Sequence, residues 1–174
     1  TTATAVSIVI GLLAGAKLAT KVGSRLDRAV SYLSAGSYAL PTWWVGILLI
    51  IIFSFQVRVF PSGGMYSPYP PPLPFGRFID LLWHAALPII TLVAVSVGGW
   101  TYVVRTMVLN TAQEDFVTVA RAKGLPEGVV MRRHIIRVAA LPILTNIILD
   151  LAGSMGGAIL TETVFNWPGM GRLY

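Results

Sequence analysis

The chain has 174 residues, of which 55% are hydrophobic and 11% are charged, whereas ordinary soluble domains carry roughly 25% charged residues. This composition argues against a water-soluble domain and favours a membrane protein. The net charge of +6 does not call for nucleic acid, because the basic residues lie between apolar runs as topology signals, and the absence of cysteine excludes disulfides and thiol chemistry.

An apolar run opens the chain, and we interpret residues 3–19 as the first membrane span. Because the chain begins inside this run and closes without a terminating span, both ends are expected to be cut from a longer protein. In the stretch that follows, Asp27 alone opposes the basic residues, which are Lys17, Lys21, Arg25 and Arg28. Such a stretch is typical of a cytoplasmic connection.

The second span is predicted over residues 29–57, which are uncharged and long enough to cross a hydrocarbon core of about 30 Å, with a kink at Pro41. Residues 58–80 are rich in proline and glycine and predict an external loop, either an inert connector or a contact for an extracellular partner. The third span is predicted over residues 81–105. There Gly98 and its neighbour Gly99 indicate a close helix approach or a bend.

A charged segment over residues 110–137 follows the third span. Asn110 and Thr111 are suitable N-cap residues, so a short helix is predicted to begin there. Its apolar positions are predicted to form one stripe, made by Phe116, Val119 and Ala120. The segment is charged and helix-forming between apolar runs, so we expect it to lie in water.

The same segment contains its own turn. Gly124 is suited to the left-handed conformation that ends a helix, and Pro126 to the first turn of the next helix. The second helix is predicted to end at Pro142. From the residues alone, an ordinary cytoplasmic loop with two amphipathic turns remains an alternative.

The fourth span is predicted over residues 138–161, with a stretch of small residues near its end that would allow close helix packing. Asp150 lies within this span, and an acidic group inside a membrane is costly unless it faces water or a partner. Two interpretations stay open for Asp150: a residue of the substrate path, or a structural pair with a polar group on a neighbouring helix. No metal site is predicted, because the two histidines lie on opposite sides of a span.

Several motifs of this chain occur together in one known family. They are DFV (115–117), ARAKGL (120–125), RH (133–134), LP (141–142), ETVF (162–165) and WPGMG (167–171). The chain resembles the permeases of ATP-binding-cassette (ABC) importers, most closely the first permease of the dipeptide/oligopeptide/nickel branch. The general family pattern begins Glu-Ala-Ala, where this chain has TVA (118–120), and its gap from the glycine to Leu-Pro is shorter; both departures suit the peptide branch.

The resemblance implies an all-α fold: a polytopic transmembrane helix bundle of the type I importer permease, with the family's first and last helices missing. It places the chain in the cell (inner or cytoplasmic) membrane as a multi-pass protein. It also implies that residues 110–137 include a coupling helix that docks into a groove of a separate ATPase. The residues expected to couple to the ATPase are Asp115, Phe116, Val119, Ala120, Arg121, Ala122, Lys123, Gly124 and Leu125.

The expected partners follow from the same resemblance. They are ABC ATPase subunits, which bind the ATP so that this chain needs no cofactor, a second homologous permease in a heterodimer, and an extracytoplasmic solute-binding protein. Peptides are the expected solute, with nickel chelates and oligosaccharides as alternatives.

The charge distribution gives the orientation without the resemblance. The four spans place residues 17–28 and 105–137 on one side of the membrane, and this side holds ten of the thirteen basic residues. These ten are Lys17, Lys21, Arg25, Arg28, Arg105, Arg121, Lys123, Arg132, Arg133 and Arg137. The positive-inside rule therefore predicts that the segment 110–137 lies in the cytoplasm.

No catalytic residue is predicted. The chain has no GxxxxGK[ST] phosphate-binding motif and no nucleophile-base constellation. Two alternatives from other classes remain: a fragment of a secondary transporter driven by an ion gradient, or a subunit of an integral-membrane enzyme. The first would show internal repeats and the second clustered intramembrane acids, whereas Asp150 stands alone in its span.

Overall fold

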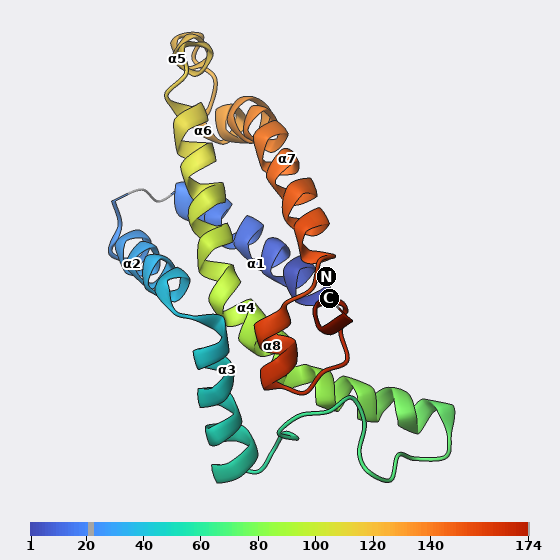
Figure 1. The fold of residues 1–174 in the computed structure, drawn as a ribbon. Coiled ribbons are helices and arrows are strands. Elements are labelled where there is room, and N and C mark those ends of the chain that lie inside the picture. Colours follow the sequence, from blue (N-terminus) through green and yellow to red (C-terminus); the bar gives the residue numbers. More distant parts are fainter. Residues whose placement is uncertain (21–22, 174) are drawn as a thin grey trace.

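Figure 1 shows the protein as a computed structural model in which every described element is a helix, as the all-α prediction expected. It describes residues 1–20 and 23–173, so Lys21 lies outside the described residues. The elements are α1 (Thr2–Ala19), α2 (Arg25–Ala39), α3 (Thr42–Ile50), the π-helical turn η1 (Ile51–Gln56), α4 (Pro74–Ala112), α5 (Asp115–Ala122), α6 (Glu127–Val129), the π-helical turn η2 (Val130–Ile135), α7 (Ile136–Ser154), α8 (Ile159–Val164) and the 3-10 turn η3 (Met170–Leu173).

Three of these helical stretches are long and apolar enough to cross a membrane. They are Thr2–Ala19, Pro74–Ala112 and the continuous stretch Glu127–Ser154. A fourth crossing results if the bent pair Asp27–Ser37 and Thr42–Gln56 counts as one span. Large apolar side chains remain exposed on the outside of the bundle, as expected for surfaces that face lipid; Leu13 and Leu141 are each 70% exposed.

The second predicted span is broken rather than kinked. α2 and α3 are bent by 94° relative to each other, with Leu40 and Pro41 between them. Leu40 adopts extended angles (φ −82°, ψ 130°), because the residue before a proline is pushed out of the helical region. The expectation of one helix over residues 29–57 is therefore wrong, and Pro41 has the stronger effect of separating two helices.

The third predicted span is part of a much longer helix. α4 has 39 residues and begins at Pro74, so the loop that was expected to reach residue 80 ends at residue 73. Proline is well placed at the first turn of a helix, where its missing N–H costs no hydrogen bond. The helix changes direction in its first half, which contains Pro88 (Figure 1).

The fourth predicted span begins earlier and ends earlier than expected. The helix runs without a break from Glu127 through Pro142 to Ser154, so the predicted end at Pro142 is wrong. The Asn146 side chain donates a hydrogen bond of 2.9 Å to the Pro142 carbonyl. The small residues after Ser154 form a turn in which Gly157 has a φ of +85°. A Cβ added to Gly157 would lie 2.7 Å from the Cα of Gly171 in η3, so the close backbone approach predicted for this stretch is made to η3 and not to a membrane helix.

The second half of α4 is the centre of the bundle. A Cβ added to Gly15 of α1 would lie 2.8 Å from the Cβ of Val104, and one added to Gly98 would lie 2.8 Å from the Cα of Ser34 in α2. Both distances are too short for a side chain, so α1 and α2 each approach α4 at a glycine. The close approach predicted for Gly98 is confirmed.

One cluster of buried apolar side chains joins the membrane helices to the segment beyond them. It draws on α1, α4, α5, η2 and α7. Its members are Ile8, Ala19, Trp100, Val104, Val108, Val117, Ala120, Val130, Ile135, Ala139 and Ile143. Because Val117 and Ala120 of α5 belong to this cluster, α5 packs directly against the helix bundle.

Candidate functional site

The helix α5 lies at one end of the molecule, beyond α4 and α7 (Figure 1). It begins at Asp115, so the predicted start at Asn110 and Thr111 is wrong. α4 continues through both residues, and the Thr111 hydroxyl donates a 3.0 Å hydrogen bond to the Met107 carbonyl inside it. A threonine can bond back within a helix as readily as it caps one, which explains the error.

The turn after α5 matches its prediction. Gly124 has a φ of +74°, in the left-handed region that favours glycine. Its N–H donates a 2.9 Å hydrogen bond to the Arg121 carbonyl. Pro126 is the N-cap of α6, one position before the first turn in which it was predicted, so the chain re-enters a helix almost at once. The turn holds α5 at a defined angle to the helix that leads back into the bundle.

The two faces of α5 differ from the predicted stripe. Val117 and Ala120 are buried, whereas Phe116 is 37% exposed and Val119 is 52% exposed. The prediction grouped Ala120 with the two exposed residues and omitted Val117, which packs into the central cluster. α5 therefore has a buried inner face and an outer face that presents an aromatic and a branched apolar side chain to the outside.

Arg121 is part of an ion pair that the sequence pattern does not predict. Its Nη2 lies 2.7 Å from Oε1 of Glu127, and its Nε donates a 3.2 Å hydrogen bond to Oε2. The pair bridges the Gly124 turn, although both side chains are largely exposed, which limits its strength. Hydrogen bonding to Glu127 raises the pKa of Arg121 above its ordinary value, so the guanidinium stays charged.

The remaining predicted coupling residues lie on the outside of this end of the molecule. Those that the structure shows as exposed, besides the residues already described, are Asp115, Ala122, Lys123, Gly124 and Leu125. α5 rests on η2, and η2 in turn contacts α4 and α7. The structure thus brings the predicted set together on one short helix and its turn. The role of this set in coupling stays a prediction.

Asp150 lies on α7 at the edge of a cleft of about 1060 Å³. The Trp100 indole N–H donates a 2.9 Å hydrogen bond to its carboxylate, so the pairing with a neighbouring helix is present. The cleft is also lined by Ser34 of α2 and by Pro41 and Asn146. Asp150 therefore forms the predicted structural pair with α4 and also lines the cleft. Pairing does not decide whether the carboxylate meets a substrate, so its place in a substrate path stays a prediction.

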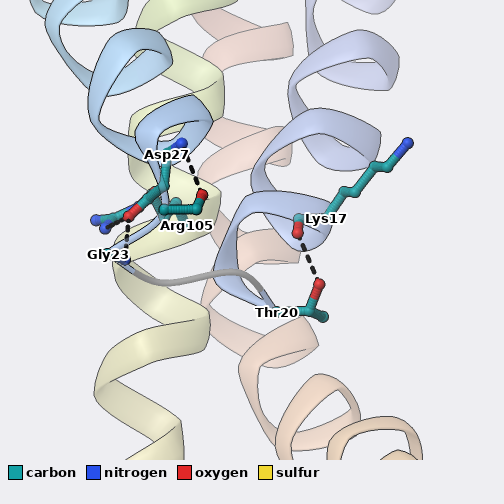
Figure 2. A network of polar contacts seen from close by, with 6 residues as sticks. Lys17, Thr20, Gly23, Asp27 and Arg105 are labelled. Carbon is teal, nitrogen blue, oxygen red and sulfur yellow. Dashed lines mark hydrogen bonds and ion pairs between the residues drawn. The ribbon is translucent and has the colours of Figure 1, made fainter.

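A second carboxylate links two helices on the side predicted to be cytoplasmic. Asp27 of α2 forms an ion pair with Arg105 of α4, with Nε to Oδ1 at 2.6 Å and Nη2 to Oδ2 at 2.8 Å (Figure 2). No local sequence pattern pairs these two residues, which are 78 positions apart. The available signal was that Asp27 is the one acidic residue among the basic residues of its stretch, on the same predicted side as Arg105.

The opposite end of the molecule is held together by Phe165, which follows α8. Its side chain is buried and packs over Gly46 of α3, where an added Cβ would lie 3.1 Å from the ring. Its carbonyl accepts a 2.9 Å hydrogen bond from the N–H of Gly64 in the proline-rich loop. The ETVF motif therefore joins α3, α8 and this loop.

The proline-rich loop is fastened to α4 as well. The N–H and the hydroxyl of Ser67 donate hydrogen bonds of 2.8 and 2.7 Å to the Asp80 carboxylate. One turn further along α4, Nδ1 of His84 lies 2.9 Å from the Asp80 carbonyl oxygen. No group of three histidine, aspartate or glutamate side chains that could hold a metal ion occurs among the residues that the structure describes.

Three relatives of the chain are each named as the permease protein of a peptide transport system. The di/tripeptide transport system permease protein DppB of Pseudomonas aeruginosa is 35% identical over 93% of this chain and 52% of its own length. The oligopeptide transport system permease protein AppB of Bacillus subtilis is 31% identical over 98% of this chain and 53% of its own length. The dipeptide transport system permease protein DppB of Escherichia coli is 36% identical over 98% and 54%.

The chain thus spans about half the length of these curated relatives. A family described as "Binding-protein-dependent transport system inner membrane component" matches residues 7–174. This description agrees with the three to four stretches that are long and apolar enough to cross a membrane. The chain belongs to this family of inner-membrane transport components.

Proposed function

We propose that this chain is part of the permease subunit of an ATP-driven peptide importer and that α5 is the contact through which a separate ATPase drives it. The observation that carries the proposal is the division of α5 into two faces. Val117 and Ala120 anchor it in the cluster shared with α4 and α7, while Phe116 and Val119 remain exposed. Exposed apolar side chains on a short, well-anchored helix favour docking of a protein partner.

The buried face of α5 allows movement of α5 to be transmitted to the helix bundle. α5 rests on η2, which continues into α7, so a push on α5 reaches the helix that carries Asp150. Closely packed interiors move as units and do not absorb such a push locally. In this proposal, nucleotide-driven closure of the ATPase moves α5, and the bundle switches between outward-facing and inward-facing states.

The proposed partners are the ATPase, a second homologous permease in a heterodimer, and an extracytoplasmic solute-binding protein. The names of the relatives support peptides as the solute. Asp150 is the proposed partner of a peptide ammonium group, because its carboxylate faces the cleft. In the complete transporter, Asp150→Asn should weaken uptake of a free dipeptide more than uptake of an N-acetylated one. Equal effects on both would remove Asp150 from substrate recognition.

The docking proposal is tested by charge insertion on α5 in the complete permease. Phe116→Glu and Val119→Glu place a carboxylate on the outer face, and Thr118→Glu adds the same charge at an exposed polar position of the same helix. The first two variants should lose co-purification with the ATPase and ATP-dependent uptake, while Thr118→Glu keeps both. Uptake that survives Phe116→Glu and Val119→Glu, or that stops when an ion gradient is collapsed at constant ATP, would overturn the proposal.

A further inference from the structure

The ion pair between Asp27 and Arg105 is the best-satisfied polar contact between two helices of the described chain. Besides its two bonds from the Arg105 guanidinium, the Asp27 carboxylate accepts a 3.0 Å hydrogen bond from the N–H of Gly23 (Figure 2). The Asp27 N–H donates to the hydroxyl of Ser24, the N-cap of α2. Asp27 is 2% exposed. A two-bond contact of this kind fixes orientation as well as distance.

The pair holds the first turn of α2, the first half of the bent unit formed by α2 and α3. This unit lies mainly along α4. Near its bend it forms one wall of the Asp150 cleft, with Ser34, Leu40 and Pro41 on that wall and Asp150 on the other. The position of α2 therefore sets how wide this cleft is.

Arg105 also lies close in sequence to α5, the proposed contact for the ATPase. It is within two helical turns of Ala112, where α4 ends before α5. Its neighbours Val104 and Val108 belong to the buried cluster that contains Val117 and Ala120 of α5. A displacement that starts at α5 reaches this part of α4 through packed side chains.

We propose that Asp27 and Arg105 are positioning residues that make the α2–α3 wall of the cleft follow the movement of α4. This inference rests on the proposed function, because it needs α5 to be driven by an ATPase. It adds the route from α5 to the cleft wall. An ion pair that only stabilised the fold would affect the stability of the protein, whereas a positioning pair affects how much peptide is transported for each ATP hydrolysed.

The first experiment uses the complete transporter in proteoliposomes with Asp27→Asn, Arg105→Lys and the exchanged pair Asp27→Arg with Arg105→Asp. Arg105→Lys keeps the charge and loses the planar two-bond geometry. Both single variants should retain the ATPase during purification and keep its basal hydrolysis. Peptide transported per ATP should fall by about 2-fold to 30-fold, the range found for substitutions in coupling networks, and the exchanged pair should recover part of it.

The second experiment measures the cleft directly. In a complete transporter whose other cysteines have been replaced, spin labels at Leu40→Cys and Leu149→Cys report the distance between two opposite, exposed residues of the cleft lining. Added nucleotide should shift this distance in the parent complex, and Asp27→Asn should abolish or reduce the shift. A shift that Asp27→Asn leaves unchanged, or a ratio of transport to hydrolysis equal to that of the parent, would overturn the inference. A parent complex without an ATPase would instead overturn the proposed function.

Discussion

Replacing Gly124 by valine tests whether the shape of the turn after α5 matters. Nothing lies within 4 Å of a Cβ built on Gly124, so valine meets no steric obstacle from the rest of the molecule. The cost comes from the backbone, because φ is +74° and L-residues pay about 1–2 kcal/mol in the left-handed region. A destabilisation of this size corresponds to roughly a 5-fold to 30-fold change in an opening equilibrium.

Gly128 provides the matched control for this change. It is also exposed and also has open space around a built Cβ, but it lies in α6 and is absent from the glycines with positive φ. Valine is a slightly better helix former than glycine. Gly128→Val should therefore leave the turn intact, although it adds the same side chain four residues away.

Hydrogen exchange on the complete permease measures the difference. The informative amides are those of Lys123, bonded to the Val119 carbonyl at 3.1 Å, and of residue 124, bonded to the Arg121 carbonyl at 2.9 Å. Both should exchange roughly 5-fold to 30-fold faster in Gly124→Val and at the parent rate in Gly128→Val. Uptake should fall only in Gly124→Val. Unchanged exchange, or an equal effect of both substitutions, would refute the argument from backbone strain.

Three further substitutions test the packing and the exposed pair. Gly15→Leu on α1 should lower the free energy of unfolding in detergent by about 1–3 kcal/mol, measured by thermal unfolding, because an added Cβ lies 2.8 Å from Val104. Gly36→Ala is the control, because a Cβ added there has nothing within 4 Å and should have little effect. Phe165→Ala should cost about 3–5 kcal/mol in the same thermal assay because its ring is 1% exposed, while Tyr69→Ala, at 94% exposed, should be neutral. Glu127→Gln should speed hydrogen exchange in the Gly124 turn only slightly, because both members of the Arg121–Glu127 pair are largely exposed. In 1 M salt the variant and the parent should exchange at the same rate, since salt screens exposed charges. A difference in exchange rate that persists at 1 M salt would contradict a weak, exposed ion pair.

The features that the sequence predicted correctly depend on local properties of the chain. The apolar runs identify the crossing helices because about 20 consecutive apolar residues are needed to cross a bilayer. Gly124 was identified as a left-handed turn because glycine followed by Leu-Pro after a helical stripe leaves few other conformations. Pro41 was predicted correctly as the position where the helix changes direction. The angle of this change, 94°, depends on how α2 and α3 pack on α4, which the sequence does not report.

The features that the sequence missed depend on contacts between distant segments. Asp27 and Arg105 lie in different helices, and only their shared side of the membrane hinted at a pair. The burial of Val117 is not predicted because Phe116, Val119 and Ala120 fit a helical stripe as well as Val117 and Ala120 do. Which stripe is buried is decided by η2, a partner that the local pattern of α5 does not contain.

The second half of α4 explains why these distant contacts converge. Gly98 and Arg105 are separated by two helical turns and so share a face, and both contact α2. Val104 is where α1 approaches α4 at Gly15, and Trp100, one turn earlier on the same stripe, binds Asp150 of α7. A rotation of this half-helix therefore changes its contacts with α1, α2 and α7 together. Trp100 packs against Gly11 of α1 as well as bonding to Asp150 of α7, whereas Arg105 pairs with Asp27 of α2. Variants of Trp100 should therefore disturb α1 and α7 together, and variants of Arg105 should act through α2, so their effects on the cleft walls should be separable.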